Sequence, residues 1–158
     1  MNVEDFLAHA IQLEAEAAMR FGQLADAMAT NGNPEVSRLF RRLSDYSRLH
    51  LSDARARSGF RDLPELRHDE FVWPDLESPE SAAIWGADPF IGREDALNIA
   101  LQAEMAGLDY YQRVSETTDD PETRILAREF ADEERDHVSE LKKWIAAHAA
   151  GETLPIDP

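Results

Sequence analysis

A glutamate and a histidine three residues apart, Glu134 and His137, are the first residues of this sequence that suggest chemistry. On an α-helix such a pair projects from one face, so both side chains could reach the same metal cluster. Glu14, Glu104 and His50 occupy comparable positions in three other segments, where an amphipathic helix would otherwise present an apolar side chain. Carboxylate and imidazole ligands without thiolate suit iron, manganese or zinc, and these residues do not choose among the three metals.

Four segments of helical composition must position these residues. They are rich in Ala, Leu, Glu and Arg, which favour helices, and they cover about 2–29, 34–58, 93–116 and 121–149. Four of the eight prolines and three of the seven glycines lie between positions 59 and 92, which indicates a long linker there. Asn33 and Asp120 each precede a proline, so we expect a side-chain N-cap at both helix starts. Gly151 is expected to end the last helix.

The carboxylates fall on the helix faces that should be buried. Glu14 lies four residues after Ala10 on the apolar stripe of 2–29. Glu104 takes a position on the apolar stripe of 93–116 where an apolar residue would be expected. Glu134 and His137 take two such positions on the stripe of 121–149. A buried carboxylate without a partner costs several kcal/mol, and each further one nearby adds like-charge repulsion. Because no Arg or Lys lies on these stripes, a divalent metal ion is the simplest source of the missing positive charge.

The chain shows signs of an internal duplication. Three stretches of the first half recur at an offset of about 90: residues 10–14 match 100–104, 33–35 match 120–122, and 43–50 match 130–137. We therefore expect two αα-hairpins, about 2–58 and 93–149, joined by a crossover at about 59–92 within a single domain spanning 1–158. A linker of this length can run back along the bundle, which predicts an all-α, up-down-down-up four-helix bundle.

Composition excludes several classes of function. The chain has 158 residues and a formal net charge of −16, which repels nucleic acid and anionic membrane surfaces. It contains no cysteine, which removes disulfides, thiol catalysis and iron–sulfur ligation. The first residues are acidic rather than basic, unlike a secretory signal, and no apolar run approaches the roughly 18 residues that span a bilayer. We expect a cytoplasmic protein.

The sequence resembles the ferritin-like superfamily, and within it the rubrerythrin-like proteins, over both hairpins. Proteins of this kind hold two irons between four helices. One Glu comes from each of the first and third helices, and a Glu-x-x-His pair comes from each of the second and fourth. The resemblance implies an iron cofactor of two ions, with zinc or manganese as alternatives. Carried over by position, it implies five metal ligands: Glu14, His50, Glu104, Glu134 and His137.

The chain departs from the family pattern at Ser47, where the family has the glutamate that usually bridges the two metals. The change reduces the expected carboxylates from four to three and leaves Glu134 as the candidate bridge. Asp53, three residues after His50, is expected to face solvent. A weakened second metal, a single-metal site or a site without redox activity are the outcomes left open.

The resemblance implies an oxidoreductase of peroxidase or ferroxidase type, which reduces peroxide or dioxygen or oxidises and handles ferrous iron. A metal-binding or sensory module without turnover is one alternative, and a metal-free helical scaffold is another. Because rubredoxin-type iron needs cysteines, an external electron donor is expected, and a homodimer is implied. Near the expected ligands, His9 and Glu16 are predicted to be solvated and Tyr111 to be a core aromatic.

Overall fold

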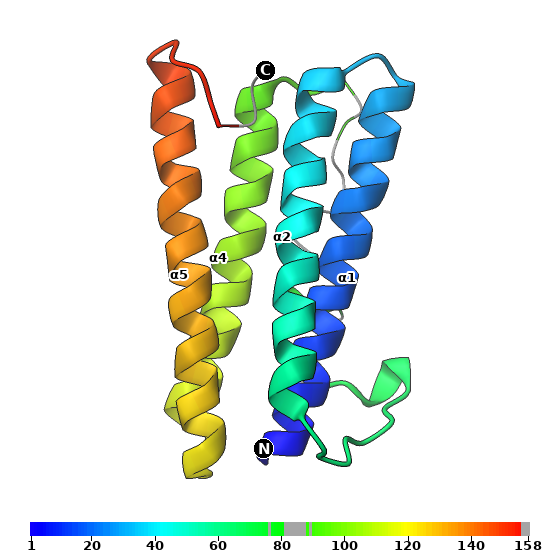
Figure 1. Ribbon diagram of the computed structural model, residues 1–158, viewed down its shortest axis with the longest axis vertical. Helices are drawn as coiled ribbons and strands as arrows, with labels where there is room; N and C mark the ends of the chain where they lie inside the picture. Colours follow the sequence, from blue (N-terminus) through cyan, green and yellow to red (C-terminus); the bar gives the residue numbers. More distant parts are fainter. Residues whose placement is uncertain (76, 81–87, 89, 156–158) are drawn as a thin grey trace.

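The computed structural model describes residues 1–75, 77–80, 88 and 90–155, and four long helices dominate it (Figure 1). Each predicted helix end agrees with the structure within one residue. The helices are α1 (Val3–Thr30), α2 (Pro34–Ser58), α4 (Arg93–Thr117) and α5 (Pro121–Ala149), and a short 3₁₀ helix, η1 (His68–Glu70), lies in the crossover. No strand occurs among the described residues, which confirms the all-α prediction.

The helices form two antiparallel hairpins, α1 with α2 and α4 with α5 (Figure 1). The chain runs up along α1, down along α2, down again along α4 and up along α5. Since α2 and α4 are parallel, the crossover must connect opposite ends of the bundle. In addition, α2 contacts α4 and α1 contacts α5, so that all four helices enclose one core. This arrangement is the four-helix bundle with one long crossover that the sequence predicted.

Local sequence explains where the helices begin and end. Asp120 caps α5, because its carboxylate accepts the backbone N–H of Thr123 at 3.0 Å and the hydroxyl of that residue at 2.6 Å. Gly151 follows α5 with φ +75°, a left-handed conformation that glycine adopts without steric cost. The prediction of a side-chain cap at Asn33 is wrong. The Asn33 carboxamide instead donates to the carbonyl of Ile91 at 2.8 Å and ties the α1–α2 loop to the end of the crossover.

The apolar core is divided into two clusters along the bundle axis. One cluster includes Phe21, Phe40 and Trp144, and the other includes Phe6 and Phe130. In each helix the residues of the two clusters are separated by a middle stretch, and the predicted metal ligands come from these four stretches. The fold therefore places a polar layer between two hydrophobic ones.

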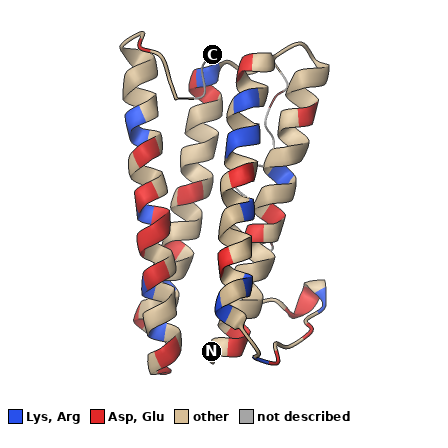
Figure 2. Cartoon of the chain, in the orientation of Figure 1, with Lys and Arg blue, Asp and Glu red and all other residues tan. Residues whose placement is uncertain are grey.

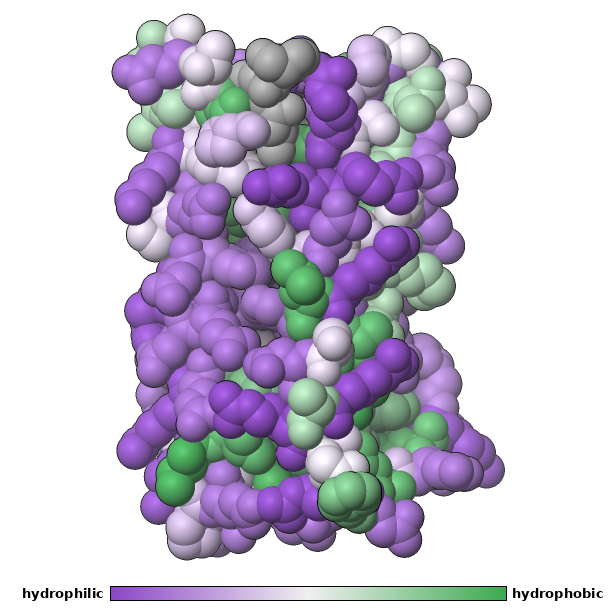
Figure 3. All heavy atoms as spheres, viewed as in Figure 1, coloured by the Kyte–Doolittle hydropathy of each residue, from purple (hydrophilic) through white to green (hydrophobic). Residues whose placement is uncertain are grey.

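Lys, Arg, Asp and Glu residues occur along all four helices (Figure 2), and the face shown in Figure 3 is mostly hydrophilic. None of the described helices has a stretch that is both long and apolar enough to cross a membrane.

Candidate metal centre

The structure brings all five predicted ligands into the polar layer. Glu14 comes from α1, His50 from α2, Glu104 from α4, and Glu134 and His137 from α5. The three carboxylates are buried, with exposed fractions of 3% or less, whereas the His50 and His137 side chains retain 15% and 21% exposure. The imidazoles therefore stand between the buried acids and the surface.

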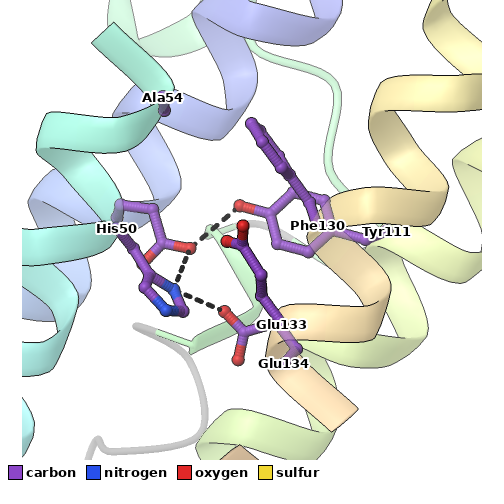
Figure 4. Close-up of a pocket in the computed structure, with 7 residues that line it drawn as sticks. His50, Ala54, Tyr111, Phe130, Glu133 and Glu134 are labelled. Carbon is purple, nitrogen blue, oxygen red and sulfur yellow. Dashed lines mark hydrogen bonds and ion pairs between the residues drawn. The ribbon is translucent and has the colours of Figure 1, made fainter. Parts of the chain in front are cut away.

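His50 connects the acids of two helices (Figure 4). Its Nδ1 lies 3.3 Å from Oε1 of Glu134 and 3.6 Å from Oε1 of Glu14. The hydroxyl of Tyr111 donates to the same Glu14 oxygen at 3.0 Å. Tyr111 is a buried aromatic, as predicted, but its hydroxyl also orients one of the candidate ligands. A small pocket in this region is lined by Glu14, His50, Ala54, Tyr111, Phe130, Glu133 and Glu134.

His137 occupies the other side of the layer. Its Nδ1 lies 3.7 Å from Oε2 of Glu104, and its ring stacks on that of His50 with 4.4 Å between centroids. The ring of Tyr46 contacts His137 from α2, with 5.2 Å between centroids. The two imidazoles thus face the same small volume from opposite hairpins, as ligands of one cluster should.

The structure adds a residue that the sequence did not reveal, Glu80 in the crossover. Its side chain is 1% exposed, and its carboxylate belongs to a cluster with those of Glu14 and Glu134. Glu80 follows a serine and a proline in a stretch without helical periodicity, so no local pattern marks it as buried. The one indirect indication of a further carboxylate was its absence at position 47, where the structure has a buried serine.

Two groups of possible metal ligands meet at Glu134. One group contains His50, Glu134 and His137, and the other contains Glu14, Glu80 and Glu134. Within each group, one ligand atom per residue lies within 4.8 Å of the others, a spacing at which a single ion can contact all three. Glu134 is the residue that the two groups share. Because its carboxylate has two oxygens, it is the natural candidate for a bridge between two ions.

The electrostatics of the layer favour a cation. Among the described residues, neither oxygen of Glu80 and neither oxygen of Glu134 has a hydrogen-bond partner, although His50 is close to Glu134. Burial, followed by the charges of neighbouring acids, raises the pKa of Glu80 and of Glu134 well above the ordinary value. A divalent ion would satisfy these oxygens and stabilise their ionised form, so the donor set fits a metal.

Glu104 and His50 have pKa values set by competing causes. Burial alone would raise the pKa of Glu104, but the Glu134 and His137 side chains outweigh it and the pKa is lowered. Burial alone would lower the pKa of His50, but hydrogen bonding to Glu14 and the surrounding carboxylates raise it. Both shifts have the direction expected when imidazoles and carboxylates of the layer stabilise each other's charged forms.

Three neighbours differ from the prediction. His9 is buried, because its ring is enclosed by Phe71 and Trp73 and its Nε2 accepts the backbone N–H of Val72 at 3.0 Å. Glu16 is half-buried rather than solvated and accepts the Ser78 hydroxyl at 2.5 Å. Asp53, expected to face solvent, is half-buried beside Glu133, whose pKa is raised by burial and by the Asp53 carboxylate. In the first two cases the crossover packs on a helix face that looked exposed in the sequence.

Comparison with known proteins gives a relative among the solved structures. No protein-family model matches the chain, and no curated protein matches it. The four-helix architecture together with the candidate centre fits a ferritin-like, metal-binding class of protein. Among solved structures, the chain is similar to an uncharacterized conserved protein from Magnetospirillum magnetotacticum MS-1. The two are 33% identical, with a TM-score of 0.69 and 98% of each chain covered. The chain belongs to the same family as that conserved protein.

Proposed function

We propose that this chain is a ferritin-like protein of rubrerythrin type that binds two metal ions, iron in the first place, between its four helices. The observation that carries the proposal is the sharing of Glu134 by two groups of buried ligands. A single group of acids would suit one structural ion, whereas two groups joined by a common carboxylate suit a dinuclear centre.

The chain's own residues have distinct roles in this proposal. Glu14, Glu104, Glu134, His50 and His137 hold the metals, and Tyr111 keeps the Glu14 carboxylate in place through its hydrogen bond. The apolar clusters above and below the layer exclude water, which strengthens every charge interaction inside it. The pocket beside Glu133 is the route by which a small oxidant reaches the layer.

Iron held in this way would supply the electrons for reducing peroxide or dioxygen, so that oxidant removal or ferrous-iron oxidation is the proposed activity. Reducing equivalents then come from a separate electron donor, because none of the 158 residues is a cysteine that could hold an iron–sulfur centre. We also propose a homodimer as the working form.

A metal-binding module without turnover is the second candidate. It is favoured by one observation, the buried Ser47 at the position where a bridging carboxylate is expected. A hydroxyl offsets little metal charge, so a centre that depends on α2 for a bridge would hold its metals without cycling them. The two candidates agree on metal binding and differ in turnover.

Anaerobic addition of ferrous iron tests the proposal. Binding only to the folded state stabilises it, by about 2.7 kcal/mol at a hundredfold excess of free metal over Kd. We expect the melting temperature of the parent to rise and that of Glu134→Gln to stay constant. Glu129→Gln, a change of an exposed carboxylate on the same helix, should behave as the parent does.

Subsequent addition of peroxide separates the candidates. Rapid appearance of ferric absorbance with consumption of peroxide supports the oxidoreductase. Bound iron that stays ferrous in peroxide contradicts the oxidoreductase and supports the metal-binding module without turnover. A parent that binds no metal contradicts both.

A further inference from the structure

We propose that Glu80, from the crossover, is the fourth carboxylate ligand of the centre and creates a metal position made of carboxylates alone. The inference rests on the proposed dinuclear centre and concerns which residue completes it. In this chain the acid that α2 lacks at Ser47 is supplied by a segment outside the helical bundle.

The side chain of Glu80 is placed as a ligand would be. It is 1% exposed, and both of its oxygens lack a hydrogen-bond partner among the described residues. One of these oxygens lies within 4.8 Å of carboxylate oxygens of Glu14 and Glu134. A glutamate normally turns to water, since burying its carboxyl without a partner costs several kcal/mol. Here it points into the layer where a cation would bind.

The bundle leaves room for this side chain at Gly107. A Cβ atom at this position would collide with Oε1 of Glu80 and lie 3.2 Å from its Cγ and Cδ. Gly107 lies in the middle of α4, three residues after Glu104, where glycine costs about 1 kcal/mol relative to alanine. The absence of a side chain at 107 is therefore what admits the carboxylate of Glu80.

A second contact fixes the crossover next to the site. The hydroxyl of Ser78, which is fully buried, donates to Oε2 of Glu16 on α1. Glu16 also accepts from the side chain of Gln12 at 2.7 Å, so its carboxylate is held on the helix surface. Ser78 thus anchors the segment two residues before Glu80 and directs that side chain inward.

The consequence is a centre with two unequal positions. His50, Glu134 and His137 offer imidazole nitrogen, which suits iron and zinc, whereas Glu14, Glu80 and Glu134 offer only oxygen, which suits manganese and other hard ions. The first position is built from helices alone, and the second depends on the crossover. We expect two binding steps, of which only the carboxylate-only step requires Glu80.

Anaerobic calorimetric titration with Mn(II) tests this assignment without any measurement of activity. The parent should bind two ions in two steps. Glu80→Gln, which keeps the shape of the side chain, should retain one step and lose the other or weaken it at least tenfold. Glu65→Gln changes an exposed carboxylate of the same crossover and should titrate as the parent does. Electron paramagnetic resonance should show a coupled Mn(II) pair in the parent and an isolated Mn(II) ion in Glu80→Gln.

A second variant reaches the same site while keeping the glutamate. Gly107→Ala replaces glycine in a helix, which favours the fold, but its methyl group displaces the Glu80 carboxylate. It should also bind one ion, with the helical circular dichroism of the parent. If Glu80→Gln and Gly107→Ala both bind two ions with the parent's affinities, the assignment of Glu80 is wrong although the dinuclear centre stands. If the parent itself binds no ion, the proposed function fails.

Discussion

Buried carboxylates are the side chains that most constrain this protein at the scale of single residues. Glu14, Glu80, Glu104 and Glu134 lie within one layer and are nearly inaccessible to water. Such a cluster destabilises a metal-free protein, because each acid must either stay protonated or repel its neighbours. The partners that the layer does offer, two imidazoles and one phenol, balance only part of the charge. The layer is thus better suited to holding cations than to supporting the fold.

Two adjacent tyrosines provide a matched test of these contacts. Tyr111→Phe removes the hydrogen bond to Glu14 and should lower the free energy of unfolding of the metal-free protein. Hydrogen bonds to charged groups contribute about 1.5–3 kcal/mol. Tyr110→Phe removes a hydroxyl that is buried and has no hydrogen-bond partner among the described residues. It should leave stability unchanged or raise it.

Urea unfolding of both variants at neutral pH measures the difference. A Tyr111→Phe variant as stable as the parent would show that the hydroxyl does not hold Glu14.

At the scale of elements, the crossover is more than a connection between the hairpins. It packs on α1 through His9, which is enclosed by Phe71 and Trp73, and through Glu16, which accepts from Ser78. The His9 ring contacts backbone groups at both nitrogens: the Asp5 carbonyl lies 2.7 Å from Nδ1, and the N–H of Val72 donates to Nε2. These partners require a neutral ring with its proton on Nδ1.

Stability should therefore fall in mildly acidic solution through His9. Burial lowers the pKa of His9 below its ordinary 6.5, outweighing the raising effect of the Asp5 carbonyl. Between the lowered folded pKa and 6.5, the unfolded chain binds more protons than the folded one. The contribution of His9 is thus complete above pH 6.5 and is lost as the pH falls below it.

The measurement is the free energy of unfolding from pH 5 to pH 8, compared between the parent and His9→Gln. The parent should lose more stability on acidification than the variant does, because the variant lacks this titration. His68→Gln, a change of an exposed histidine in the crossover, is the control and should follow the parent. Parallel curves for parent and His9→Gln would contradict the assignment.

At the scale of the whole molecule, the net charge is −16, and residues of both signs lie along all four helices (Figure 2). Arginines of α2 and the start of the crossover pair with acids of α1 and α5, including Arg41 with Asp26 and Arg57 with Glu129. Exposed pairs of this kind contribute about 0–1 kcal/mol each, so repulsion among the remaining acids is the larger effect.

Salt should consequently stabilise the metal-free protein. Raising NaCl from about 0.01 M to about 0.15 M shortens the screening length from about 30 Å to about 8 Å. The melting temperature should rise by several degrees, since self-repulsion of a strongly charged chain opposes the compact state. Scanning calorimetry with NaCl and KCl in parallel separates screening from a specific ion effect. A melting temperature that falls with both salts would show that the ion pairs dominate.

The amino-acid sequence by itself determined the helices, their buried faces and most residues of the candidate site. Helix ends follow from local features such as Asp120 and Gly151, and the positions of Glu14, Glu104 and Glu134 follow from the 3.6-residue period, because the buried face of a helix is a property of local spacing. Only the tertiary structure decided what the crossover does. The burial of His9 and the arrival of Glu80 beside Glu134 depend on contacts between distant segments. In a stretch without hydrophobic periodicity, the local sequence does not indicate which side chains will be buried or on which surface they will pack.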